Sequence, residues 1–221
     1  CCTLPAGNAL AIRHYSLSDY GLDHNEYRIG VRKNPDDMSG SVSRHIHETI
    51  RPGSVMLVSE PKGEFVLDTS AENPVALVSA GVGVTPMLCM LKALAKENPN
   101  RPVWFIHGAR NGAEHAYASE VRRLTDRSAN AHAHFRYTRP RTVDLMGRDH
   151  DSEGRVDTEL IKSLIPLDSD VYICGPDTFM SDVRDGLKQW GIPGERIHIE
   201  SFGGGSQVGS VENVGMVDAE V

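Results

Sequence analysis

The chain has 221 residues, of which 39% are hydrophobic and 24% are charged, and its formal net charge is −7 at pH 7. This composition is typical of a globular protein with one large or two small domains, and it gives no reason to expect nucleic acid or an anionic membrane as a partner. No apolar run approaches the roughly 20 residues that cross a bilayer, and the first residues lack the basic and apolar regions of a signal peptide, so we expect a cytoplasmic protein.

Residues 1–70 are predicted to form a first domain built on a small antiparallel sheet. Short alternating apolar runs predict strands at 27–31, 55–58 and 65–67. Between the first two, hydroxyl side chains followed by apolar residues at helical spacing predict a short helix over 41–50. The domain is therefore expected to contain one helix that interrupts the sheet.

The segment 13–18 alternates in the manner of a strand. This pattern places Arg13 and Tyr15 on one face and His14 and Ser16 on the other. A cation and an aromatic ring on one face suit a phosphate and a flavin ring, although such pairs also occur on the surfaces of ordinary sheets.

A second candidate anion site lies where the predicted short helix opens. Its backbone amides and hydroxyl groups come from Gly40, Ser41, Val42 and Ser43.

From Pro74 the pattern changes to strands followed by helices, which marks a domain boundary. Strands are predicted at 75–79, 103–107, 133–138, 170–174 and 196–200. Helices are predicted at 87–97, 113–127, 157–164 and 177–190. Such alternation requires crossover connections, so residues 71–205 are predicted to form a doubly wound parallel sheet covered on both faces. The small and polar residues 206–221 are predicted to be a linker or the start of a further domain.

A glycine-containing turn follows the first strand of the second domain and opens its first helix. Gly81 and Gly83 allow a ligand to approach the backbone closely, Thr85 can cap the helix, and Pro86 suits its first position. Free amides at the positive end of a helix dipole are expected to bind a pyrophosphate. The turn departs from GxGxxG because Pro86 replaces the third glycine, so a simple tight turn is the alternative.

The ends of two further strands add candidate binding residues. His107 ends one strand, and Arg110 follows it where an NAD-selective site would carry an acidic residue. The Arg110 guanidinium can pair with a 2′-phosphate and so favour NADPH, or it is an exposed arginine without a ligand. Cys174 ends the other strand and is expected either to border a nicotinamide or to be a buried thiol before a tight turn.

Six motifs in order and at characteristic spacing give the chain a resemblance to the ferredoxin:NADP reductase superfamily, and most of all to the reductase half of flavohaemoglobins. The motifs are Arg13-His14-Tyr15-Ser16, Gly40 to Ser43, Gly81-Val82-Gly83-Val84-Thr85-Pro86, His107-Gly108-Ala109-Arg110-Asn111, Cys174-Gly175-Pro176 and Glu200-Ser201-Phe202-Gly203. Together they cover about 11–204. The resemblance implies a flavin-dependent oxidoreductase that transfers hydride from NAD(P)H to FAD and electrons onward to a haem or iron-sulfur acceptor.

The resemblance also implies roles for individual residues. In the FAD-binding barrel, Arg13 would bind the flavin pyrophosphate, Tyr15 would lie against the isoalloxazine and Ser16 near its N5. Residues 40–43 and 81–86 would hold the phosphates of FAD and NAD(P)H. Near the nicotinamide, the residues implied are Cys174, Gly175 and Pro176, and near the flavin they are Glu200 and Phe202. Ser16, Cys174 and Glu200 are thus the catalytic candidates.

Two departures from the family pattern affect these expectations. Family barrels have roughly 40 more residues before the first motif, so the barrel is expected to be partial, with its N-terminal strands missing. The sequence carries neither a globin nor a cysteine cluster, so the haem or iron-sulfur acceptor is expected outside this sequence, on the same full-length polypeptide or on a separate partner. The tail could begin an appended ferredoxin domain or be disordered.

Other chemistry-bearing residues give weaker patterns. Cys89 and Cys174 stand alone in apolar stretches and are expected to be reduced and buried. Two histidine pairs, at 45 and 47 and at 132 and 134, have no third ligand nearby in the sequence, so no metal site is expected. A regulatory module that binds nucleotide or a partner without turnover is the alternative function.

Overall fold

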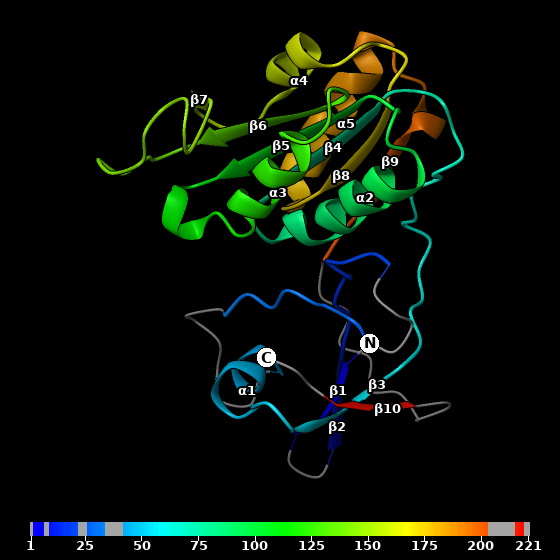
Figure 1. Ribbon diagram of the computed structural model, residues 1–221, viewed down its shortest axis with the longest axis vertical. Helices are drawn as coiled ribbons and strands as arrows, with labels where there is room; N and C mark the ends of the chain where they lie inside the picture. The colour runs from blue at the N-terminus through cyan, green and yellow to red at the C-terminus, as the bar shows by residue number, and fades with distance from the viewer. Residues whose placement is uncertain (1, 7–8, 22–25, 34–41, 203–214, 219–221) are drawn as a thin grey trace. The chain divides into compact units, whose positions relative to one another are not determined.

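The computed structural model describes residues 2–6, 9–21, 26–33, 42–202 and 215–218. The chain divides into two compact units (Figure 1). The first comprises Cys1–Leu17, Gly21–Glu64 and Gly204–Val221, and the second comprises Ser18–Tyr20 and Phe65–Gly203.

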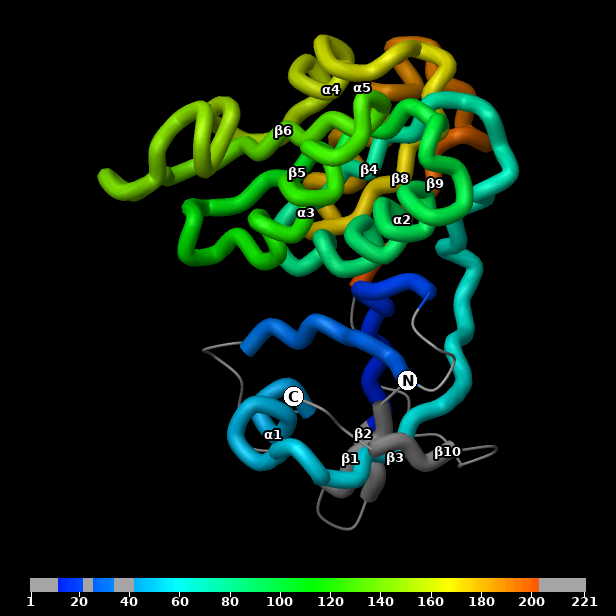
Figure 2. Tube along the Cα trace, viewed as in Figure 1, coloured from blue at the N-terminus to red at the C-terminus, as the bar shows by residue number. Residues whose placement is uncertain are grey.

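The second unit is built on a six-stranded sheet in the order β7-β6-β5-β4-β8-β9, in which every pair is parallel. The strands are β4 (Val75–Ala80), β5 (Val103–Ala109), β6 (Ala131–Tyr137), β7 (Ser152–Glu153), β8 (Asp170–Cys174) and β9 (Ile197–Glu200). The Cα trace runs from β4 outward to β7 and then returns to the other side of β4 at β8 (Figure 2). The strand order therefore reverses between β4 and β8, which is where open parallel sheets bind ligands.

Helices cover both faces of this sheet (Figure 1). On one face lie α2 (Val84–Glu97) and α3 (Ala118–Thr125), and on the other α4 (Thr158–Leu164) and α5 (Asp177–Trp190). Leu77 and Phe105 pack toward the first pair of helices, whereas Val78 and Ile106 pack toward the second. Because the central strands are buried on both sides, they are almost continuously apolar. The predicted parallel sheet with helices on both faces is confirmed.

Several elements of the second unit differ from their predicted limits. Helix α2 begins three residues before the predicted 87 and follows directly on the short 3₁₀ turn η1 (Gly81–Gly83). A separate turn, η2 (Gly112–Glu114), precedes α3, so that the helix is shorter than predicted. Strand β7 was not predicted, since two residues carry no periodic signal.

A buried arginine joins the segment before β4 to the sheet. Arg101 is 3% exposed, and its guanidinium donates hydrogen bonds to the carbonyl oxygens of Asp68 and Asn73, both at 2.6 Å. It also forms an ion pair of 2.9 Å with the carboxylate of Asp170 at the start of β8. The Arg101 side chain thus holds the segment before β4 against the start of β8.

The first unit contains a four-stranded antiparallel sheet in the order β10-β3-β1-β2. Its elements are β1 (Cys2–Ala6), β2 (Ala9–Arg13), α1 (Val42–Glu48), β3 (Val55–Val58) and β10 (Gly215–Asp218). Val42, Ile50 and Met56 form a small core. The predicted strand at 55–58 and the predicted short helix are present.

Three other predictions for this region are wrong. Residues 27–31 form no strand but only an isolated bridge between Leu17 and Ile29. Residues 65–67 form no strand either; they belong to the second unit, where the Phe65 ring packs edge-on against Tyr172 with ring centres 5.8 Å apart. The strand predicted over 13–18 ends at Arg13.

The tail predicted as a linker or the start of a further domain contains β10, which pairs with β3. Among the residues described, no helix is long and apolar enough to cross a bilayer.

Candidate functional site

The turn after β4 has the geometry of an anion site. Gly81 adopts a φ of +57°, which favours glycine, and a Cβ placed there would meet no atom within 4 Å. The turn continues directly into the 14-residue helix α2, and no side chain caps η1 or α2. The first amides of a helix have no intrahelical acceptor, and they lie at the positive end of its dipole. An anionic group can therefore approach the backbone beside Gly81.

A second turn, after β8, meets the first. A Cβ on Gly83 would overlap the carbonyl oxygen of Cys174, so these two backbones are in direct contact. A Cβ on Gly175 would lie 2.9 Å from the Cδ1 atom of Phe179 and 3.3 Å from the Cβ of Ala80. The structure thus brings two of the sequence-predicted motifs together at the point where the strand order reverses.

Cys174 is a buried neutral thiol. Burial raises its pKa to about 12, and the carboxylate of Glu200 adds to this effect. The two residues are register partners on β8 and β9. At neutral pH the thiol stays protonated, so Cys174 is suited to a neutral contact and not to nucleophilic attack.

The residues after β9 are tied to the start of α5. Ser201 Oγ donates a hydrogen bond of 2.7 Å to the carboxylate of Asp177, the first residue of α5. Phe202, which follows, is 39% exposed. Pro176 is the N-cap of α5, so the predicted residues 174–176 and 200–202 flank the same helix terminus.

Thr85 does not cap α2 as predicted. It is the second residue of the helix, and its hydroxyl donates a 3.2 Å hydrogen bond to the Val82 carbonyl oxygen. Pro86 is the third helical residue, and Val84, Thr85 and Pro86 are all buried. Only Gly81, Val82 and Gly83 supply the turn itself, because the helix begins earlier than the sequence pattern indicated.

His107 lies inside the second unit. It is completely buried, with Nδ1 2.9 Å from Ser79 Oγ, and its ring stacks on His115 at 4.8 Å between centres. Burial lowers its pKa well below the usual value, so the ring is neutral. Ser79 and Ala80 are the last residues of β4 before the Gly81–Gly83 turn, so His107 contacts the strand that carries this turn.

Arg110 is exposed beyond the end of β5. Its Nη1 atom lies 3.4 Å from the carboxylate of Glu114, one helical turn further on, and the side chains are 58% and 41% exposed. An exposed pair of this length restrains a guanidinium weakly. Arg110 is therefore accessible to an anionic group, in competition with Glu114.

The remaining predicted residues belong to the first unit. Arg13 ends β2, and its guanidinium donates to the Ile12 carbonyl oxygen at 2.8 Å. Tyr15 packs against the core of this unit, His14 is exposed and Ser16 is partly buried. The side chain of Val42 is in the core, so this residue offers only its backbone, and Ser43 follows it in α1. Gly40 and Ser41 lie outside the described residues.

Comparison with known proteins places the chain in a family. The family model described as oxidoreductase NAD-binding domain matches residues 77–185. The chain is 40% identical over 206 residues to the flavohemoprotein of Deinococcus radiodurans and 42% identical over 195 residues to that of Rhizobium meliloti. These matches cover 90% and 87% of this chain but 49% and 48% of the relatives, so the chain spans about half the length of the curated relatives it matches.

Solved structures extend this comparison to the fold. The flavohem-like FAD/NAD binding domain of nitric oxide dioxygenase from Vibrio cholerae is 30% identical, with a TM-score of 0.75 over 90% of this chain and 81% of that chain. The chain belongs to the flavohaemoglobin reductase family, within the ferredoxin:NADP reductase superfamily. A flavohaemoglobin from Malassezia yamatoensis with bound FAD and haem is similar at 25% identity and a TM-score of 0.74, over 91% of this chain and 50% of that chain. The family assignment from the six motifs is confirmed.

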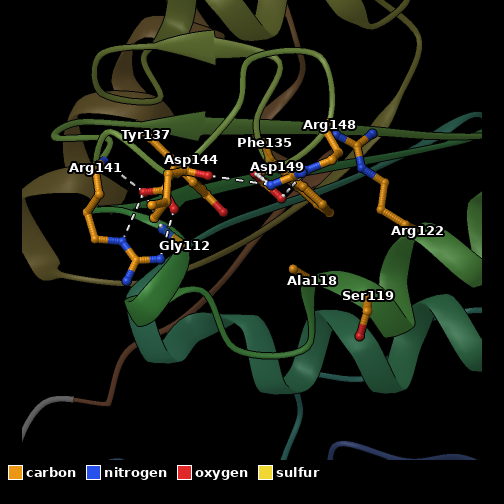
Figure 3. Close-up of a pocket in the computed structure, with 11 residues that line it drawn as sticks. Gly112, Ala118, Ser119, Arg122, Phe135, Tyr137, Arg141, Asp144, Arg148 and Asp149 are labelled. Atoms are coloured by element: carbon orange, nitrogen blue, oxygen red, sulfur yellow. Dashed lines mark hydrogen bonds and ion pairs between the residues drawn. The ribbon is translucent and has the colours of Figure 1, made fainter.

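This member of the flavohaemoglobin reductase family also has a cavity of about 490 Å³, and none of the predicted site residues line it. It lies beside α3 and the segment after β6, where Arg141 pairs with Asp144 at 2.9 Å and Arg148 with Asp149 at 2.7 Å (Figure 3). Asp144 also accepts a hydrogen bond from the Gly112 amide at 3.2 Å. The third arginine of the lining, Arg122, forms an ion pair of 2.6 Å with Asp151. Because each of these arginines already has a carboxylate partner, we place the functional site at the two glycine turns.

Proposed function

We propose that this member of the flavohaemoglobin reductase family is an NAD(P)H-dependent flavin oxidoreductase module that transfers hydride to FAD and passes electrons to a haem or [2Fe-2S] centre. The observation that carries the proposal is the direct contact between the turns at Gly83 and Cys174, at the reversal point of the sheet. The names of relatives support it, since they include flavohemoproteins and a phthalate dioxygenase reductase described as passing electrons from pyridine nucleotides to [2Fe-2S].

The second unit supplies the nucleotide site in this proposal. The Gly81, Val82 and Gly83 amides bind the pyrophosphate of NAD(P)H, because the helix terminus and the open space at Gly81 suit an anion. Cys174 and its neighbours Gly175 and Pro176 border the nicotinamide. The neutral thiol of Cys174 adds no charge beside the ring.

In this proposal residues 1–70, most of which lie in the first unit, are a partial FAD-binding barrel that supplies the flavin site, and residues 71–205 are the NAD(P)-binding domain. The antiparallel sheet of the first unit and the placement of Arg13 at the end of β2 support this assignment. Arg13 and residues 40–43 hold the FAD phosphates. Tyr15 lies against the isoalloxazine.

When bound, FAD accepts two electrons as hydride and releases them one at a time, which is the chemistry that the protein itself cannot supply. The chain positions the reacting groups and controls protons. The Ser16 hydroxyl donates a hydrogen bond toward the flavin N5, the Glu200 carboxylate exchanges protons, and Phe202 shields the ring from water.

The proposal is tested on the FAD-loaded holoenzyme. NADH or NADPH is added anaerobically, and flavin reduction is measured as the loss of flavin absorbance. Ser16→Ala should slow reduction by about tenfold to a hundredfold while FAD remains bound. An unchanged rate would remove Ser16 from the mechanism. A protein that binds FAD but is reduced by neither nucleotide would instead support the regulatory module without turnover.

A further inference from the structure

Three residues just after the Arg13–Ser16 motif belong to the other unit. Ser18–Tyr20 is assigned to the second unit, although its chain neighbours Leu17 and Gly21 are assigned to the first. Ser18 is completely buried. The chain therefore enters the second unit for three residues and leaves it again.

Helix α2 holds this segment through side chains on one side. Cys89 Sγ donates a hydrogen bond of 2.9 Å to the Asp19 carbonyl oxygen, and Tyr20 Oη donates one of 3.2 Å to the carboxylate of Glu97. The Lys96 ammonium lies 5.6 Å from the centre of the Tyr20 ring. These positions recur at helical spacing on the side of α2 that does not face the sheet.

Lys92 lies on the same side of α2 and has two carboxylate partners. Its Nζ is 2.7 Å from Asp19 Oδ2 and 2.6 Å from Glu120 Oε1, which belongs to α3. The three side chains are only 15%, 16% and 18% exposed. The other oxygen of Asp19 accepts a 2.8 Å hydrogen bond from the Tyr20 amide. Lys92 thus joins the inserted segment to two helices through charges that water screens poorly.

We propose that Lys92 and Asp19 are positioning residues that limit how far Ser16 can move from helix α2, which follows the Gly81–Gly83 turn. Ser16 is two residues from Ser18, and an extended chain spans at most about 3.5 Å per residue, so the anchored segment confines Ser16 to within about 7 Å of Ser18. This inference rests on the proposed function, in which Ser16 and the Gly81–Gly83 turn position the two reacting rings. A misplacement of about 1 Å between reacting groups lowers a rate by about a hundredfold.

Asp19→Asn and Glu120→Gln form a matched pair for the test. Each removes one carboxylate charge from the same Lys92 ammonium and keeps the side-chain shape, but only Asp19 lies in the inserted segment. In the FAD-loaded holoenzyme, Asp19→Asn should lower the rate of flavin reduction at saturating NAD(P)H by about tenfold, with nucleotide and FAD dissociation constants within about twofold of wild type. Glu120→Gln should stay within about twofold of the wild-type rate.

Amide hydrogen exchange provides a readout that does not require activity. In Asp19→Asn the amides of residues 14–20 should exchange faster than in Glu120→Gln, in the protein without nucleotide. If Asp19→Asn is too unstable to isolate, Tyr20→Phe replaces it. Tyr20 is 40% exposed, and this substitution removes the hydroxyl group that donates to Glu97 but keeps the ring. Tyr20→Phe should lower the rate of flavin reduction by about threefold and should speed amide exchange in the same segment.

The outcomes separate this inference from the proposed function. Equal rates and equal exchange in the matched variants would overturn the positioning role. A wild-type holoenzyme that NAD(P)H cannot reduce would overturn the proposed function, and with it the positioning role. Faster flavin reduction in Asp19→Asn would also contradict the inference, since it would show that the Asp19–Lys92 ion pair slows hydride transfer.

Discussion

His115 is a buried neutral base, and this makes the stability of the second unit depend on pH. Its side chain is 7% exposed, and its Nδ1 is 2.9 Å from the Tyr137 hydroxyl oxygen. Its Nε2 has no hydrogen-bond partner among the residues that the structure describes. Burial lowers the pKa of His115 from 6.5 to about 4, and the positive charge of Arg122 contributes to the decrease.

Acid should destabilise the second unit, because His115 binds a proton at a higher pH in the unfolded chain than in the folded one. Between about pH 6.5 and about pH 4 the unfolded His115 is protonated and the folded one is not, so the free energy of unfolding decreases as the pH falls through this window. Above the window the stabilisation is fully present. The whole shift corresponds to about 3 kcal/mol, of which about 2 kcal/mol is lost between about pH 7 and about pH 5. Burial also lowers the pKa of His107 well below its usual value, which adds a loss in the same direction.

Urea unfolding followed by tryptophan fluorescence measures this effect in the second unit, because both tryptophans, Trp104 and Trp190, lie there. His115→Gln keeps a polar group for Tyr137 and removes the titration. From about pH 7 to about pH 5 the wild type should lose about 2 kcal/mol more than this variant. His14→Gln, which replaces an exposed histidine of the first unit, is the control. Equal pH dependence in the wild type and His115→Gln would refute the reasoning.

Three further perturbations test other parts of the second unit. Gly83→Ala places a Cβ on the Cys174 backbone and should lower the free energy of unfolding, measured in urea, by about 3 kcal/mol. The Cβ of Gly81→Ala meets no atom, so this variant should lose only about 1 kcal/mol, from its left-handed backbone, and should mainly weaken NAD(P)H binding. Arg101→Met should lower the free energy of unfolding by about 3 kcal/mol, because it breaks a buried ion pair and leaves two carbonyl groups without their donor; a loss under about 1 kcal/mol would contradict this. Arg110→Ala should raise the Michaelis constant for NADPH by about tenfold and leave that for NADH nearly unchanged, and equal effects would reject a contact with the 2′-phosphate.

The sheet of the second unit was predictable because its central strands are buried on both faces. Continuous apolar runs such as Val75–Ala80 have no competing interpretation once helices alternate with them. Helix α5 was predicted with its observed limits, since Gly191, at φ +113°, ends it in the left-handed conformation that favours glycine. Local sequence thus determined these elements.

Contacts between segments far apart in the chain were less predictable, because a short apolar run or a single charged residue does not specify its partner. Phe65 belongs to a run that reads as a strand, yet its ring is placed by Tyr172, more than 100 residues away in the chain. Likewise, Lys92 reads as a solvent-facing residue of an amphipathic helix, and nothing near it in the sequence indicates Asp19 as its partner. Such contacts are set by tertiary structure and leave no periodic pattern.

The two glycine turns were identified from sequence, but the environment of His107 was not. His107 is two residues from Phe105 and two from Ala109, so the three side chains lie on the same face of β5. Phe105 and Ala109 pack in the core with α2 and α3, so the period of the strand already indicated that His107 points inward. The contacts of His107 with Ser79 and His115 required the structure, because the three residues come from separate segments of the chain.

The assignment of Ser18–Tyr20 to the second unit affects how reductases of this family can be recombined. A chimera that exchanges residues 1–64 as a block also imports a foreign version of this three-residue segment, while its contact residues Cys89, Lys92 and Glu97 remain those of the original chain. Exchanges that leave the segment native, or that replace its helix contacts along with it, should yield well-folded hybrids more often than cuts made at the domain boundary alone.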